Sequence, residues 1–252
     1  MSIRLPAGWG VGIERQRFDT RERVQKALAA LGNGFDWWYD WLHNSPAADD
    51  PRYIPMSYGH RVWDRPEEVE RFRDKLVLFM NEPETPDVPS LTPQQAARFT
   101  RRQIQAFWRY DIPFTWAAPN SNVNLENIGW VYAYAEELRK IGIEAPPYWG
   151  FHLYTPQTVA EWNHLLHNMW TFWRQYGADR PVVITEVAVG THLEAAPTIM
   201  ALARELLEDE RVLGVCWFSA GADWLWPGAQ LVDTSDEEFR LTPLGRLFVS
   251  LK

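Results

Sequence analysis

Two stretches decide how this chain folds: Leu78-Phe79-Met80-Asn81-Glu82-Pro83 and Val182-Val183-Ile184-Thr185-Glu186. Each contains a run of bulky or β-branched apolar residues that leads into a glutamate. Such a run is typical of a buried parallel strand, and the C-terminal ends of parallel strands form the mouth of an α/β barrel. We therefore expect Glu82 and Glu186 to converge from two different strands on one substrate.

Strand-like and helix-like segments alternate along the rest of the chain, which predicts a parallel, closed sheet. We expect strands at residues 9–14, 35–41, 52–58, 76–81, 113–118, 148–154, 182–187 and 212–219. We expect helices at residues 21–31, 66–75, 92–110, 127–141, 158–176, 194–208 and 243–251. The sequence contains no internal repeat, low-complexity segment or linker. It therefore predicts an α/β protein with a single (β/α)8 TIM barrel over residues 1–252.

Length and charge agree with that fold and exclude several partners. The chain has 252 residues, which is typical of such a barrel. Its net charge is −8 with no basic block, so we expect neither nucleic acid nor an anionic membrane surface as a partner. No apolar stretch approaches the ~20 residues of a membrane span. We expect a monomer. Residues 1–6 do not resemble a signal peptide, and secreted and cytoplasmic locations both fit the sequence.

Further candidate residues follow from the geometry of a barrel, whose active site lies at the C-terminal ends of the strands. Period-two alternation places His152 and Tyr154 on the same face of their strand. The chain has 15 tryptophans, and large aromatic side chains either fill cores or stack on the apolar faces of sugar rings. The candidate substrate-binding residues are Asn81, Trp38, Trp41, His152, Tyr154 and Trp217.

Several of these residues also fit a purely structural role. His152 fits a core histidine bonded to the backbone, and Trp217 fits the packed interior of a barrel. His164 and His167 lie one helical turn apart, but no glutamate motif accompanies them. We therefore predict no metal site and no cofactor.

The motifs resemble a known group of enzymes. Asn81-Glu82 on the fourth strand with Glu186 on the seventh resembles the clan A glycoside hydrolases, which are retaining enzymes on (β/α)8 barrels. Within that clan, the chain is similar to glycoside hydrolase family 128, whose short barrels act on β-1,3-glucan. The matching stretches are Trp38-Tyr39-Asp40-Trp41, Tyr53-Ile54-Pro55-Met56, Phe79-Met80-Asn81-Glu82-Pro83-Glu84, His152-Leu153-Tyr154, Ile184-Thr185-Glu186, Cys216-Trp217-Phe218, Leu231-Val232-Asp233-Thr234 and Leu241-Thr242-Pro243-Leu244-Gly245. The chain departs from the family pattern at Ser57-Tyr58-Gly59 and at Leu153.

This resemblance implies a role for each candidate. Glu186 would be the nucleophile, and Glu82 would be the acid that protonates the leaving oxygen and then the base that activates water. Asn81 would hydrogen-bond the 2-hydroxyl of the sugar. His152 and Tyr154 would orient Glu186 or the substrate, and the three candidate tryptophans would stack on sugar rings.

Three functions fit the sequence. The first is a retaining endo-acting hydrolase of β-1,3-glucan, with a polysaccharide or oligosaccharide as its only partner. The second is the same chemistry on another β-linked polysaccharide, such as β-1,4-glucan, mannan or xylan, because the loops of a barrel set its specificity. The third is a non-catalytic glycan-binding barrel. The pairing of Asn81-Glu82 with Glu186 argues against the third, because a pure binder does not need both carboxylates.

Overall fold

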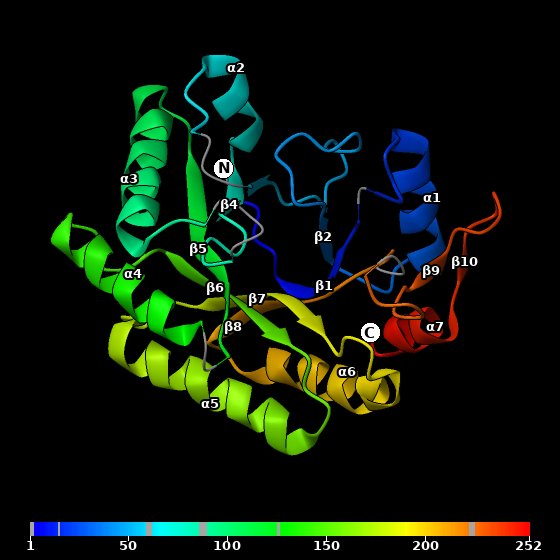
Figure 1. The fold of residues 1–252 in the computed structure, drawn as a ribbon. Helices are drawn as coiled ribbons and strands as arrows, with labels where there is room; N and C mark the ends of the chain where they lie inside the picture. Colours follow the sequence, from blue (N-terminus) through cyan, green and yellow to red (C-terminus); the bar gives the residue numbers. More distant parts are fainter. Residues whose placement is uncertain (1–2, 15, 59–61, 86–89, 125–126, 222–224) are drawn as a thin grey trace.

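A computed structural model of the chain describes residues 3–14, 16–58, 62–85, 90–124, 127–221 and 225–252 (Figure 1). Eight strands form one sheet in which every paired neighbour is parallel. The sheet order is β2-β1-β8-β7-β6-β5-β4-β3. The strands are β1 (Gly8–Gly12), β2 (Trp37–Tyr39), β3 (Met56–Ser57), β4 (Lys75–Phe79), β5 (Phe114–Asn122), β6 (Tyr148–Tyr154), β7 (Val182–Ala188) and β8 (Val212–Trp217).

The two edges of this sheet meet through the segment that precedes β3. Trp38 of β2 forms an isolated parallel bridge with Tyr53. Its backbone N–H donates to the carbonyl of Arg52 at 3.1 Å, and its carbonyl accepts from the N–H of Ile54 at 2.9 Å. These bonds close the ring, and the predicted α/β fold class with a (β/α)8 barrel is confirmed.

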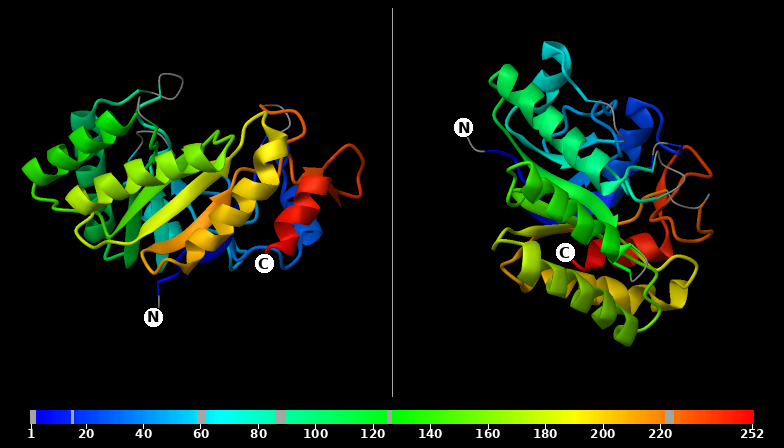
Figure 2. Two further views of the ribbon diagram at one scale, coloured as in Figure 1. Left: turned by 90° about the horizontal axis from the view of Figure 1, so that it is seen from below. Right: turned by 60° about the vertical axis from the view of Figure 1, so that its left-hand side comes forward.

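Helices surround this ring, as the views in Figure 2 show. The α-helices follow one another and the strands in the order predicted from the sequence. They are α1 (Arg21–Leu31), α2 (Pro66–Val69), α3 (Pro93–Arg109), α4 (Ile128–Lys140), α5 (Val159–Tyr176), α6 (Ala196–Glu205) and α7 (Pro243–Ser250). Short 3₁₀ turns extend them at η1 (Glu70–Phe72), η2 (Leu193–Ala195) and η3 (Leu206–Glu208). No helix in the described part of the chain is both long and apolar enough to span a membrane.

Capping residues explain where two of the longest helices begin. The Thr92 hydroxyl accepts from the backbone N–H of Gln95, and the Gln95 side chain accepts in return from the N–H of Thr92. Thr158 and Glu161 form the same reciprocal pair at the start of α5. Each pair satisfies N–H groups that a helix leaves free at its first turn.

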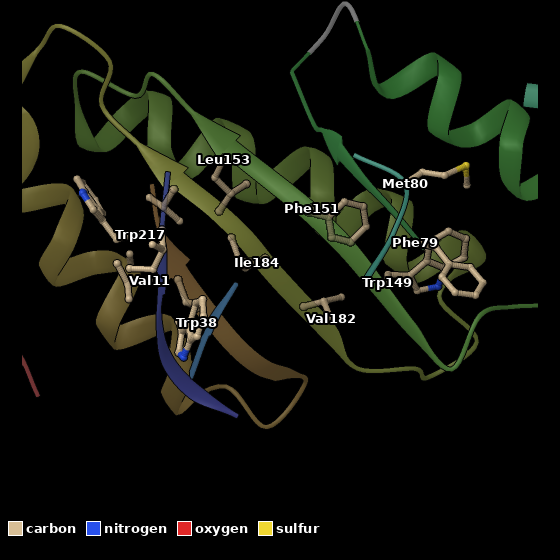
Figure 3. Packing of buried hydrophobic residues seen from close by; sticks show 14 of the residues in the cluster. Val11, Trp38, Phe79, Met80, Trp149, Phe151, Leu153, Val182, Ile184 and Trp217 are labelled. Carbon is tan, nitrogen blue, oxygen red and sulfur yellow. The ribbon is translucent and has the colours of Figure 1, made fainter. Parts of the chain in front are cut away.

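Alternation along the strands divides the apolar residues into two layers. Side chains on the inner faces fill the barrel, and the members of this cluster are Trp37, Tyr39, Ile54, Met56, Leu76, Leu78, Ala117, Val183 and Cys216. The outer faces pack under the helices in a larger cluster, part of which is shown in Figure 3. Gly10 makes room for the indole of Trp37, since a Cβ there would lie 2.4 Å from its ring. The large inner tryptophan therefore requires glycine on the neighbouring strand.

The strands differ from the prediction mainly at their ends. We expected residues 52–58 to form the third strand, but only Met56 and Ser57 do so. Pro55 lacks the N–H that a ladder needs. The fourth strand ends at Phe79 rather than at residue 81, because Met80 adopts φ +53°. A short antiparallel pair, β9 (Val232–Asp233) with β10 (Arg240–Leu241), was not predicted.

Candidate active site

Glu186 lies near the C-terminal end of β7, on its inner face, and is 1 % exposed. Its Oε1 accepts hydrogen bonds from the hydroxyl of Tyr39 and from the indole N–H of Trp41, both at 2.8 Å. Its Oε2 accepts from the hydroxyl of Tyr154. Tyr39 and Trp41 come from β2 and the residues after it, and Tyr154 comes from β6. Three donors from two other strands therefore fix the orientation of this carboxylate.

Burial dominates the electrostatics of this carboxylate. It raises the pKa of Glu186 to about 7, the charge of His152 opposes this rise, and the charge of Glu82 adds to it. The hydrogen bonds from Trp41 and Tyr39 also lower the pKa, because they favour the charged form. Near neutral pH, the protonated and the ionised forms of Glu186 are therefore present in comparable amounts.

His152 lies on β6 between the two glutamates and is fully buried. Its Nδ1 is 3.0 Å from Oε1 of Glu82, within hydrogen-bond distance. Its Nε2 is 3.3 Å from Oε1 of Glu186, a charge contact outside hydrogen-bond geometry. Burial lowers the pKa of His152, but the charges of Glu186 and Glu82 outweigh burial, so the pKa is raised above 6.5. One imidazole therefore brings Glu82 and Glu186 to the same small volume.

The backbone after β4 turns sharply to present Glu82. Met80 and Glu82 both adopt a left-handed conformation, at φ +53° and +40°. Residues other than glycine, asparagine and aspartate rarely do so, and such backbone strain clusters at active sites. Asn81, between them, is buried, and its Oδ1 has no hydrogen-bond partner among the described residues. An amide oxygen left in this state beside a cavity is available to a ligand.

Glu84 ties this turn to the neighbouring strand. Its carboxylate accepts from the hydroxyl of Ser121 at 3.0 Å and from the N–H of Asn122 at 3.1 Å, both on β5. Burial raises the pKa of Glu84, and these bonds oppose the rise. Through these contacts, Glu84 anchors the turn that carries Glu82 to β5.

A cleft of about 790 Å³ opens above these groups, at the C-terminal end of the barrel. Carboxylates, amides and aromatic rings line it together, which is the composition of a site for a polar ligand with apolar faces. The lining residues are Glu14, Gln16, Asp19, Asp40, Trp41, Leu42, Tyr58, Asn81, Glu82, Tyr154, Glu186, Phe218, Leu225 and Trp226.

Aromatic side chains form one wall of the cleft. Phe218 packs edge-on against Trp41, Tyr154 and Trp226, with ring centroids 5.3, 6.0 and 5.4 Å apart. Trp226 also packs edge-on against Tyr154 at 5.8 Å. These contacts hold the rings in fixed orientations beside Glu186, so the wall is built before any ligand arrives.

The structure brings six of the eight predicted site residues together: Glu82, Glu186, Asn81, Trp41, His152 and Tyr154. The prediction that Trp38 and Trp217 face the substrate has to be corrected. They are 0 % and 1 % exposed and lie in the outer layer under the helices (Figure 3). Trp38 points opposite to Tyr39, and Trp217 points opposite to Cys216, because neighbouring residues on a strand face opposite sides.

Several residues in or beside the cleft were not predicted from the sequence. Tyr39 was detectable, since alternation from Trp41 puts it on the same face. Glu14 lies shortly after β1. Burial raises the pKa of its carboxyl group, and a hydrogen bond from the backbone N–H of Gln16 partly opposes that rise. Phe218 directly follows β8 and was also detectable, because it lies two positions after Cys216, whose side chain faces the barrel interior. Trp226 lies well beyond the end of β8, where no strand periodicity marks it. The described residues contain no group of three or more His, Cys, Asp or Glu that could hold a metal ion.

The family model described as "Glycosyl hydrolase catalytic core" matches residues 16–248. The chain belongs to this family. It is a glycoside hydrolase, and both glutamates lie inside the matched region. A search among curated protein sequences gives no match.

Several solved structures of glycoside hydrolases have a fold similar to that of this chain. A family 128 subgroup II endo-β-1,3-glucanase from Sorangium cellulosum is 20 % identical, with a TM-score of 0.73 over 97 % of this chain and 98 % of that one. One from Pseudomonas viridiflava is 21 % identical, with a TM-score of 0.69 over 100 % and 98 %. A subgroup I enzyme from Amycolatopsis mediterranei, in complex with laminaritriose, is 16 % identical, with a TM-score of 0.72 over 98 % and 100 %. The resemblance to family 128 that the sequence predicted is thus confirmed in fold.

Proposed function

We propose that this glycoside hydrolase is a retaining endo-acting β-1,3-glucanase, with Glu186 as nucleophile and Glu82 as acid/base. The observation that carries the proposal is the position of His152, whose two ring nitrogens contact Glu82 at 3.0 Å and Glu186 at 3.3 Å. Two carboxylates on one imidazole, at the floor of a cleft, form the pair that glycosidic bond cleavage requires.

The first half of the reaction uses Glu186 in its charged form. Its carboxylate attacks the anomeric carbon while the bond to the leaving oxygen breaks, and the proton of Glu82 passes to that oxygen. The product is a covalent glycosyl ester on Glu186 and a shortened chain with a free hydroxyl. Tyr39 and Trp41 hold the attacking carboxylate in one rotamer, which removes the entropy cost of aligning it during the reaction.

The second half returns the enzyme to its starting state. Glu82, now a carboxylate, takes a proton from water, and the resulting hydroxyl attacks the anomeric carbon and displaces Glu186. The net configuration at that carbon is retained, because it is inverted twice. Once Glu186 is an ester, its negative charge no longer acts on His152, and Glu82 and Glu84 remain as the acidic neighbours of the imidazole.

The remaining cleft residues are proposed to bind sugar. Asn81, whose Oδ1 is unpartnered among the described residues, is proposed to hydrogen-bond the 2-hydroxyl, an interaction that strengthens as charge develops in the transition state. Trp41 and Tyr154, with Trp226, provide aromatic surface for the faces of the rings. The relatives support β-1,3-glucan as the substrate: those from Sorangium and Pseudomonas are named endo-β-1,3-glucanases. The Amycolatopsis enzyme was crystallised with laminaritriose.

The test combines a substrate panel with the stereochemistry of the product. Reducing-sugar release would be measured on laminarin, curdlan, barley glucan, cellulose, mannan and xylan, with Glu186→Gln as the control. We expect release from laminarin and curdlan only, oligosaccharides of several lengths as early products, and no release by the variant. Proton NMR should show the β-anomer appearing first. Release from another polymer would contradict β-1,3-glucan as the specific substrate, and an initial α-anomer would contradict the retaining mechanism.

A further inference from the structure

A second hollow lies at the opposite end of the barrel from the catalytic cleft. It has a volume of about 650 Å³. It lies beside Phe114, the first residue of β5, and beside Pro147 and Arg180, which precede β6 and β7. The C-terminal ends of α4 and α5, which lie side by side at the left of Figure 1, lead into two of its loops. None of the catalytic residues lines it, so this distal hollow is a separate site.

An exposed tryptophan forms part of its lining. Trp108, in the last turn of α3, is 71 % exposed, whereas its neighbours Ile104 and Phe107 are buried under the same helix. The lining also includes Phe114 and the buried Trp116. Leaving an indole in water is unfavourable, so an exposed ring at the edge of a cavity indicates a ligand with an apolar face.

Polar side chains of both signs complete the distal hollow. Arg101, Gln105, Glu144 and Arg180 all line it. No ion pair or side-chain hydrogen bond engages the guanidinium groups of Arg101 and Arg180 or the carboxylate of Glu144 anywhere in the described part of the chain. Their hydrogen-bonding groups are therefore available to a ligand. A mixture of donors and acceptors suits a neutral polyhydroxylated molecule better than it suits a strongly charged one.

We propose that the distal hollow binds a segment of β-glucan chain, with a sugar ring on Trp108 and hydroxyl groups on Arg101, Gln105 and Glu144. This inference rests on the proposed function, because the ligand is the polymer that the cleft is proposed to cleave. The two sites face opposite ways, so they engage different chains or distant parts of one chain. Binding at the distal hollow would hold the enzyme on insoluble glucan and raise the local concentration of substrate at the cleft.

The test separates binding to insoluble polymer from turnover of soluble substrate. Depletion assays on curdlan would use the inactive Glu186→Gln protein as parent, with Trp108→Ala and Trp108→Phe added to it. We expect Trp108→Ala to weaken binding roughly two- to tenfold, the factor that an aromatic stacking contact provides, and Trp108→Phe to recover most of that loss. Arg109→Ala, on the same exposed turn but outside the hollow, is the matched control. Arg101→Ala against its neighbour Arg102→Ala gives a second pair.

Kinetics and solution mass distinguish the outcomes. In the active protein, Trp108→Ala should leave kcat/KM on laminarihexaose unchanged while it slows the hydrolysis of curdlan. Equal binding of curdlan by parent and Trp108→Ala, with laminarihexaose still cleaved, would overturn the distal site alone. Failure of the active protein to cleave any β-1,3-glucan would overturn the proposed function and this inference together. If light scattering shows a dimer that the Trp108→Ala substitution dissociates, the hollow binds a second copy of the chain. That result would contradict the proposal that its ligand is β-glucan.

Discussion

The two ends of the barrel differ in which residues other than glycine adopt a left-handed backbone. At the C-terminal end these are Trp41, Met80, Glu82 and Thr155. At the N-terminal end, in the turns that lead into β4, β5 and β7, they are Asp74, Asp111, Ala178 and Asp179. Aspartate tolerates this conformation through local hydrogen bonds, whereas bulky or β-branched residues pay about 1–2 kcal/mol each. The strain at the mouth is therefore tied to side chains whose direction matters, and the turns at the other end merely reverse the chain.

Charge divides the two ends in the same way. Glu186 is buried at the mouth among donors that hold it, and His152 beside it is fully buried. Glu144 at the other end is exposed to water. A buried carboxylate near its own pKa responds to every neighbour, while an exposed one is screened by solvent. Substitutions at the C-terminal end of the barrel should therefore change the rate of catalysis, whereas substitutions at the N-terminal end should leave that rate unchanged.

The largest expected effect separates the two ends most clearly. Glu186→Gln should lower kcat on laminarin by on the order of 10⁴-fold, because it removes the nucleophile while nearly preserving shape. Glu144→Gln, the same change at the N-terminal end, should leave kcat on this soluble substrate within about twofold, as is usual for an exposed residue remote from the chemistry. Steady-state kinetics with both variants measures the contrast. Comparable losses in the two would contradict the division.

The donors to Glu186 should show the next largest effect. Tyr39→Phe removes a buried hydrogen bond to a charged group, and kcat/KM should fall about 10- to 100-fold. Tyr148→Phe provides the matched control, since Tyr148 begins β6 at the opposite end of the barrel interior. It should leave kcat/KM almost unchanged. A fall of the same size in both variants would mean that the loss reflects packing of the barrel rather than the position of the nucleophile.

The pH dependence tests the role of His152. Burial raises the pKa of Glu186 to about 7 and the charge of His152 opposes that rise, so activity should increase as pH rises through about 7. His152→Gln removes the opposing charge, and the acid limb of the kcat/KM profile should therefore move to higher pH. For each pH unit by which the acid limb moves, activity at a fixed pH on that limb should fall about tenfold. Activity at pH 6 should thus fall further than activity at pH 8.

A uniform fall across the profile would instead give His152 a purely structural role. His164→Gln, on the outer helix α5, is a control that should leave both limbs in place.

The smallest expected effect concerns the backbone itself. Thr155→Gly, at φ +58°, relieves a β-branched residue of left-handed strain and should raise the free energy of unfolding by about 0.5–1 kcal/mol. Asp179→Gly, also at φ +58°, should give no gain, because aspartate already tolerates that conformation. Urea unfolding followed by tryptophan fluorescence measures both. An equal gain in the two variants would remove the distinction between strained and unstrained turns.

The sequence reasoning succeeded where a pattern is local. Runs of apolar residues between helices predicted eight strands, and the ends of two of them predicted the glutamates that the structure brings to one histidine. It failed at Trp38 and Trp217, where proximity to a strand end was given more weight than the face that alternation assigns. It also overestimated the third strand, because apolar content alone does not reveal that the ring closes through a single bridge at Tyr53.

What the sequence determined by itself was the order of strands and helices, the closed parallel sheet and the two carboxylates at its C-terminal end. These follow from hydrophobic periodicity and from the rule that parallel strands end on one side of the sheet. The tertiary structure alone decided that Tyr39, Trp41 and Tyr154 hold Glu186, that His152 contacts both glutamates, and that Phe218 and Trp226 form a wall. Those contacts join residues far apart in the chain, and their distances and burial, which set the pKa values, arise only when the barrel closes.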